Sequence, residues 1–265
     1  MKQPTAKVQL FALFYLKLYF CNMRNFLEKL QGLVFILLAC VLVFSFAGCQ
    51  QNKTTISGTF DDCDKRYFVL MQMLPDELAT IDTVLLLNGT FNYRIKTEQV
   101  GVYIMQLSDT IFLSFIADVG EKLVFSGNFA NLMNTYNVTG SEETTLLLEN
   151  RRKLDTLYLK TAALSKEFVR HAGEDSYDSV AINRIDSIYA DNVSVHKQYL
   201  VEFILTHSDK LASLLAFYQT LGHHPFFLME EDAAILQKIY PALSAKYPNS
   251  VYIKDLQEKL KMSDD

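Results

Sequence analysis

The chain has 265 residues, of which 25 are basic and 30 acidic, and its formal net charge is −5 at pH 7. The first 48 residues hold five of the basic and one of the acidic side chains, which leaves 20 basic and 29 acidic ones and a net charge near −9 for the remainder. Because phosphates need a basic protein surface, this acidic balance argues against a nucleic-acid partner.

Residues 33–46 form an apolar run of fourteen residues without a charge. A membrane-spanning helix needs about 20 apolar residues, so this run is short for a span and fits the core of a signal peptide. Arg24 and Lys29 precede it and supply a positive end. We expect the segment to be removed on export; the alternative is an uncleaved membrane anchor.

The apolar run ends in Phe46-Ala47-Gly48-Cys49. Two small residues before a cysteine let the chain enter a peptidase in extended form, and the cysteine thiol can accept a diacylglycerol. The motif resembles the lipobox of bacterial lipoproteins, with Phe46 where leucine is usual. It predicts cleavage between Gly48 and Cys49, a lipid on Cys49, and a membrane as a partner through this lipid.

A second hydrophobic segment, residues 1–22, precedes Met23. We expect translation to start at Met23, because a complete signal peptide begins there; Met1 with an amphipathic N-terminal helix is the alternative. The expected organisation is an upstream extension with signal peptide, a tether, a β domain and a helical domain, at residues 1–48, 49–53, 54–140 and 141–265.

Short runs rich in Val, Ile, Phe, Tyr and Thr fill residues 54–140, with Gly, Asn and Asp between them. Such runs predict strands. Asn88-Gly89 predicts a β-hairpin of the runs on its two sides, because a type I′ turn needs positive φ at both positions. Neighbouring strands with short connections indicate an antiparallel β-sandwich or small barrel.

From Ser141 the apolar period becomes helical, and Ser141 is suited to cap the first helix. A second long helix is expected after Asp175. Shorter helices are expected at 209–221, 229–246 and 250–261. The predicted fold class is therefore α+β, with the helical module packed on the β domain because no low-complexity linker separates them.

The segments ISGTF, ATIDTVLLLNGTFNY, GVYIMQL, EKLVFSG and NVTGSEET, in this order, resemble the Bacteroidetes domain of unknown function 4369. The resemblance extends over roughly residues 54–262 and implies a β domain followed by a helical segment in an envelope lipoprotein. In many relatives a thioredoxin-like domain with a CxxC pair follows. We expect this chain to lack that domain; whether it was lost, is encoded separately or follows a truncated reading frame stays open.

Cys63 is the one cysteine left once Cys21 and Cys40 are removed and Cys49 is acylated. Without a partner it cannot form an internal disulfide, so redox chemistry would have to be intermolecular. Its neighbours Asp61, Asp62 and Asp64 could attract Ca²⁺, but no EF-hand pattern surrounds them, and a solvated hairpin turn is expected.

His223-His224 precedes Pro225 and is the other candidate site. A zinc site recruits three or four ligands, and the other histidines show no ligand spacing with this pair. We expect a partly exposed pair at a helix end, with Phe226 and Phe227 exposed beside it. We expect Phe112, Phe115, Phe125 and Phe129 in the sandwich core; an aromatic ligand groove is the alternative.

The sequence contains no GxSxG, GxxxxGK[ST] or GxGxxG motif. We therefore expect no enzyme activity and no cofactor. The favoured function is an envelope lipoprotein that binds or scaffolds another envelope protein or a ligand, on the periplasmic side of the outer membrane. The alternative is an accessory to thiol-disulfide oxidoreductases.

Overall fold

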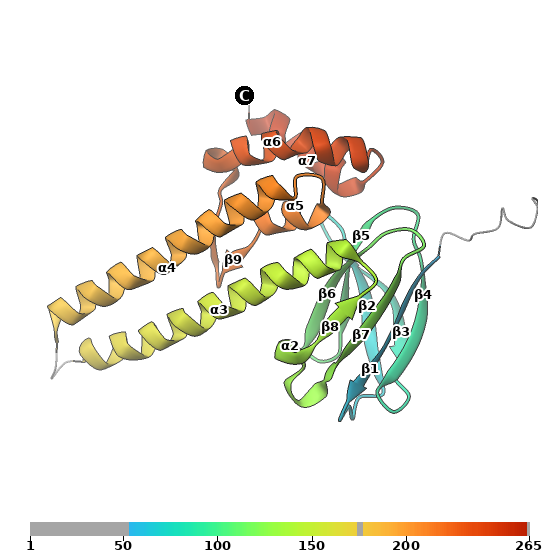
Figure 1. Cartoon of the computed structure of the whole chain (residues 1–265), viewed down its shortest axis with the longest axis horizontal. Coiled ribbons are helices and arrows are strands. Elements are labelled where there is room, and N and C mark those ends of the chain that lie inside the picture. Colours follow the sequence, from blue (N-terminus) through green and yellow to red (C-terminus); the bar gives the residue numbers. More distant parts are fainter. Residues whose placement is uncertain (1–52, 174–176, 264–265) are drawn as a thin grey trace, which may run out of the picture. The chain divides into compact units, whose positions relative to one another are not determined.

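The computed structural model describes residues 53–173 and 177–263, which belong to one compact unit (Figure 1). The apolar run, the Gly48-Cys49 cleavage site and the tether lie outside the described residues. The predicted α+β class is confirmed, because two β-sheets are followed by a helical module.

Eight strands form two four-stranded sheets. Sheet A has the order β4 (Thr90–Lys96), β1 (Lys53–Asp61), β7 (Lys122–Asn128), β8 (Asn137–Thr139). Sheet B has the order β3 (Leu78–Leu85), β2 (Tyr67–Met73), β5 (Gly101–Gln106), β6 (Phe112–Ala117). All neighbours are antiparallel except β1 and β7, which run parallel with Ile56 opposite Leu123. This pair departs from the expected antiparallel arrangement, because β7 returns to sheet A only after the chain has formed β5 and β6 in sheet B.

The inward faces of the two sheets share a hydrophobic core. Its buried members alternate along the strands and include Ile56, Phe60, Phe68, Leu70, Phe91, Leu113, Phe115, Leu123 and Phe125. Gly58 belongs to the same inward row, and a Cβ there would lie 2.5 Å from the carbonyl oxygen of Phe125. Because Gly58 has no side chain, Phe91 and Phe125 can fill the space that a Cβ would occupy.

Asn88 and Gly89 have φ values of 51° and 74°, as the predicted turn requires. Leu87 and Thr90 exchange backbone hydrogen bonds of 2.9 and 3.0 Å across it. The strands on its two sides, β3 and β4, belong to different sheets. The turn itself is confirmed, but the predicted hairpin is wrong, because β3 and β4 pair with other strands and the turn joins the two layers of the sandwich at one edge.

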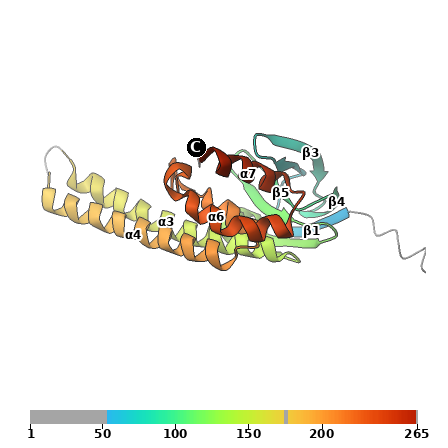
Figure 2. The same ribbon diagram turned by 90° about the horizontal axis from the view of Figure 1, so that it is seen from above.

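Two short helical turns, η1 (Phe129–Asn131) and α2 (Leu132–Thr135), connect β7 to β8. The helical module contains α3 (Glu142–His171), α4 (Ser179–Thr206), α5 (Leu211–Phe217), α6 (Met229–Lys246) and α7 (Val251–Ser263). The long helices α3 and α4 lie side by side in antiparallel directions (Figures 1 and 2). The Ser141 hydroxyl accepts a hydrogen bond from the amide of Thr144, which confirms the predicted cap.

The expected helix at 209–221 is too long. Helix α5 ends at Phe217, and a two-stranded hairpin follows, β9 (Thr220–Leu221) with β10 (His224–Pro225). Its turn contains Gly222 with a φ of 63°. Because glycine adopts positive φ without strain, the chain reverses here instead of continuing the helix.

The helices cover one end of the outer face of sheet B. Val102 and Ile116 on that face share a second buried cluster with residues of α3 to α7. The Tyr252 hydroxyl of α7 donates a 2.6 Å hydrogen bond to the Met73 carbonyl and accepts one of 3.0 Å from the Val102 amide. Strand β5 is therefore buried on both faces, which explains its unbroken apolar sequence.

Helix α3 also covers the free edge of sheet B. The Thr144 hydroxyl donates to the Ile116 carbonyl at 2.5 Å and accepts from the Ile116 amide at 3.0 Å, as a neighbouring strand would. None of the described helices is both long enough and apolar enough to cross a membrane.

Candidate functional site

The outer faces of the two sheets differ in polarity. The outward side chains of sheet A are mainly polar and include Thr55, Ser57, Thr59, Asn92, Arg94 and Ser126. A polar outer face is the usual condition of an antiparallel sheet in contact with water. The outer face of sheet B departs from this pattern.

Beyond the part that the helices cover, sheet B exposes large apolar side chains. Tyr67 is 54 %, Leu85 67 % and Phe112 44 % exposed. Tyr67 pairs with Leu85 across β2 and β3, and Gln106 pairs with both Val69 and Phe112. These five residues therefore form a continuous surface across the four strands, which we call the platform.

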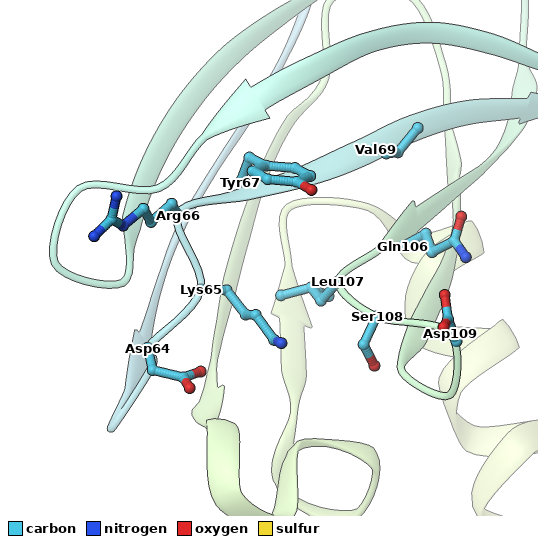
Figure 3. A pocket seen from close by; sticks show the side chains of 9 residues that line it. All are labelled: Asp64, Lys65, Arg66, Tyr67, Val69, Gln106, Leu107, Ser108 and Asp109. Atoms are coloured by element: carbon cyan, nitrogen blue, oxygen red, sulfur yellow. The ribbon is translucent and has the colours of Figure 1, made fainter.

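A pocket of about 580 Å³ opens at the end of the platform where β2 begins and β5 ends (Figure 3). It is lined by Asp64, Lys65, Arg66, Tyr67, Val69, Gln106, Leu107, Ser108 and Asp109. The β5–β6 loop is held by the Ser108 hydroxyl, which accepts hydrogen bonds from the amides of Thr110 and Ile111 at 3.3 and 3.1 Å. One wall of the pocket is thus a sheet and the other a hydrogen-bonded turn.

The pocket combines an aromatic and aliphatic wall with charges of both signs. Figure 3 shows the side chain of Lys65 extending toward Ser108, while Arg66 points away from both. No ion pair within 4.0 Å joins Asp64, Lys65, Arg66 or Asp109 to any part of the chain that the structure describes. Their charges are therefore available to a partner, and the apolar platform beside them offers contact area.

The acidic turn, Asp61-Asp62-Cys63-Asp64, lies next to this pocket. Asp62 has a φ of 54°, and its carboxylate accepts a 2.7 Å hydrogen bond from the Asn128 side chain. The turn leads from β1 in sheet A to β2 in sheet B. It is therefore a crossing between layers, and the expected hairpin turn is wrong because the two strands do not pair.

Cys63 is partly buried and packs against the core of the sandwich, near the Asn88-Gly89 turn. It forms no disulfide within the described residues. Although Cys63 directly precedes Asp64 in the chain, it does not line the pocket.

His223 and His224 are exposed at the tip of the β9–β10 hairpin, with His224 paired to Leu221. The expected position at a helix end is wrong, because α5 ends before this hairpin. No group of three His, Cys, Asp or Glu side chains suited to a metal ion occurs among the described residues. The structure therefore does not bring the two candidates, Cys63 and the histidine pair, into one site.

Phe226 and Phe227 are buried, so their expected exposure beside the histidines is wrong. Phe227 stacks on Phe217 of α5 with a ring-centroid distance of 5.1 Å, and Phe226 lies 4.8 Å from the ring of His196. The hairpin turns the chain back, and both rings enter the helical core. Conversely, Phe112 is exposed on the platform, whereas Phe115 and Phe125 are buried as expected.

Residues 54–147 match the family model of a domain of unknown function, DUF4369. The DUF4369 match covers all eight strands of the sandwich and the start of α3. It therefore includes the platform and the pocket. Searches of curated proteins and of solved structures gave no match.

Phe112 was expected in the sandwich core, and no role was expected for the other platform residues. A signal does exist in β2, where YFVLMQM is apolar at consecutive positions. Phe68 and Leu70 fill the sandwich core, which leaves Tyr67, Val69 and Met71 directed outward. A strand that is apolar on both faces predicts a second covering layer or a binding surface.

Proposed function

We propose that this protein is a lipid-anchored protein of the cell envelope that acts as a non-enzymatic binding module. Its platform and the adjoining pocket bind another envelope protein. The observation that carries the proposal is the exposure of Tyr67, Leu85 and Phe112 on one rigid sheet face. Contiguous exposed apolar side chains beside charged residues are typical of protein-binding surfaces.

The chemistry of the pocket supports recognition more than catalysis. Its titratable lining residues are two acids, two bases and Tyr67, and the lining includes no histidine or cysteine. Charges at the rim of an apolar surface orient a partner and discriminate against wrong ones. Tyrosine and phenylalanine provide large contact areas with few rotatable bonds, so little entropy is lost on binding.

The location of the protein rests on the sequence. Three residues separate Cys49 from the start of β1, so a lipid on this cysteine would hold the sandwich close to the membrane surface. We place it on the periplasmic side of the outer membrane, in keeping with the uncharged Gln50-Gln51-Asn52 after the cysteine. Metabolic labelling with a fatty acid analogue should label the wild type and not Cys49→Ala; equal labelling of both would contradict the anchor.

The binding function can be tested by comparing what co-purifies with three forms of the full chain, extracted in detergent. The wild type and Val124→Ala should retain the same envelope protein, whereas Tyr67→Ala/Phe112→Ala should lose it. Val124 is the matched control because it is an apolar side chain, 49 % exposed, on the outer face of sheet A. Retention by all three forms, or by none, would contradict a role of the platform.

The same experiment tests whether the partner is a thiol-disulfide oxidoreductase. The accessory alternative predicts enrichment of a protein with a CxxC pair by the wild type and its loss from the platform variant. Enrichment of other envelope proteins alone would remove that alternative and leave the binding module in place.

A further inference from the structure

A groove between α3 and α4 is separate from the platform and is lined by four side chains from each helix. They are Lys153, Thr156, Leu157 and Lys160 of α3 with Asn192, Val195, His196 and Tyr199 of α4. The volume of the groove is about 280 Å³. Sites for small molecules begin at about 300 Å³, so a ligand of this groove has to be small.

The lining carries positive charge without a matching negative one. Lys153 and Lys160 line the groove, no acidic residue does, and neither ammonium has a carboxylate within 4.0 Å among the described residues. Four lysines elsewhere in the helical module do have a carboxylate within 4.0 Å, for example Lys197 with Asp232 at 3.2 Å. Two unpaired cations at one groove in an acidic protein favour an anionic ligand.

Tyr199 adds an unused hydrogen-bond donor. Its hydroxyl is buried and has no hydrogen-bond partner in the structure. Burial, with a smaller effect of Glu149, raises the pKa of Tyr199 to about 12, so the hydroxyl keeps its proton at neutral pH. The Lys153 ammonium lies 5.7 Å from the centroid of the same ring. A ligand oxygen at this end of the groove would meet the Lys153 ammonium. The Tyr199 hydroxyl has almost no exposed surface of its own, so the ring has to turn toward the groove for the ligand to give this buried donor a partner.

The remaining wall is uncharged. His196 is buried, and its Nε2 lies 2.8 Å from the side-chain oxygen of Gln219. Burial lowers the pKa of His196 below its ordinary value of 6.5, with Gln219 opposing the shift, so the ring is neutral at pH 7. Leu157 is buried beside it. Recognition of charge in the groove therefore rests on the two lysines, and the space between them is bounded by apolar and neutral groups.

We propose that this groove binds a small organic anion that carries carboxylate or phosphate groups. One acidic group lies at Lys153 and the Tyr199 hydroxyl, a second lies at Lys160, and the body of the ligand packs on Leu157. The two lysines are seven residues apart, which is two helical turns and about 10 Å along the axis. This spacing fits a compound with acidic groups at opposite ends.

The proposal can be tested by calorimetric titration of the detergent-extracted full chain with terephthalate, succinate and phenyl phosphate. Saturable binding of at least one probe is expected, and the preferred probe shows whether carboxylate or phosphate is recognised. Lys153→Gln/Lys160→Gln should weaken that binding at least tenfold. Lys166→Gln is the matched control, because it removes the same charge from an exposed position of α3 outside the groove. Its affinity should equal that of the wild type.

Two further measurements locate the ligand. Tyr199→Phe should weaken binding several-fold, because it removes only the hydroxyl. The ring resonances of His196 should shift on titration of the wild type. Absence of saturable binding for all three probes, or equal affinity of the wild type and the double lysine variant, would overturn the proposal. Neither result bears on the platform, which is tested through its own variants.

Discussion

The hydroxyl of Tyr247, at the end of α6, donates a 2.6 Å hydrogen bond to the buried carboxylate of Glu143 in the first turn of α3. The same carboxylate accepts hydrogen bonds from the backbone amides of Leu211 and Ala212 at 3.0 and 2.9 Å. Helix α5 begins at Leu211 and has no side-chain cap of its own. Glu143 therefore caps α5 from another helix and ties three helices together.

Replacement of this carboxylate should destabilise the fold. Glu143→Ala leaves three buried donors without an acceptor, so we expect the free energy of unfolding to fall by about 3 kcal/mol. Urea denaturation measures the change. Glu142→Ala is the control, because the neighbouring carboxylate is exposed and pairs only with Lys210, and its effect should be much smaller. Equal effects of the two substitutions would contradict the capping role of Glu143.

The turn between the two sheets gives a second prediction. A Cβ on Gly89 would lie 2.2 Å from the carbonyl oxygen of Phe60, and φ at this residue is 74°. Gly89→Ala should therefore lower the free energy of unfolding by at least about 2 kcal/mol, from the positive φ and the clash together.

Gly120→Ala separates these two contributions. Gly120 has a φ of 81°, and a Cβ added there would meet no atom within 4 Å, so only the cost of positive φ applies, about 1 kcal/mol. Thermal unfolding of both variants measures the difference. If Gly120→Ala were as destabilising as Gly89→Ala, the close approach of the turn to β1 would not contribute.

Local features of this fold could be predicted from the sequence. The strands follow from runs of β-branched and aromatic residues, the Asn88-Gly89 turn from its need for positive φ, and the start of α3 from Ser141. Each depends on a few neighbouring residues. The sheet to which a strand belongs depends instead on residues far apart in the sequence. For this reason the parallel pairing of β1 with β7 was not foreseen.

The candidate sites were harder to predict for the same reason. Phe112 was expected in the sandwich core, but it lies with Tyr67 on the outer face of sheet B, and only the position of the helices decides which part of that face stays exposed. The burial of Phe226 likewise depends on a hairpin that redirects the chain after α5. The groove combines side chains from two helices, whose relative rotation the sequence periodicity does not fix.

The buried imidazole of His196 gives a prediction about pH. Burial lowers the pKa of His196 in the folded protein, whereas the unfolded chain takes up this proton near pH 6.5. The unfolded state therefore binds more protons as the pH falls below about 6.5, and stability decreases with acidification in this range. Above that pH both states are neutral and the contribution is constant.

Urea denaturation at pH 7.5, 6.5 and 5.5 can test this assignment with His196→Gln as the comparison. The wild type should lose more stability between pH 7.5 and 5.5 than the variant, which has no titrating group at this position. His224→Gln is the control, because His224 is exposed, and its pH dependence should match that of the wild type. Equal pH dependence of the wild type and His196→Gln would contradict the assignment.

The platform is tested most directly by photocrosslinking in intact cells. A photoreactive amino acid replaces Tyr67 or Phe112 in the full chain, and Val124 in the control, since all three positions are exposed on outer sheet faces. We expect one discrete crosslinked envelope protein, the same from Tyr67 and Phe112 and absent from Val124. The same adduct from Val124, or no adduct from either platform position, would contradict the proposal that this face of sheet B binds a partner.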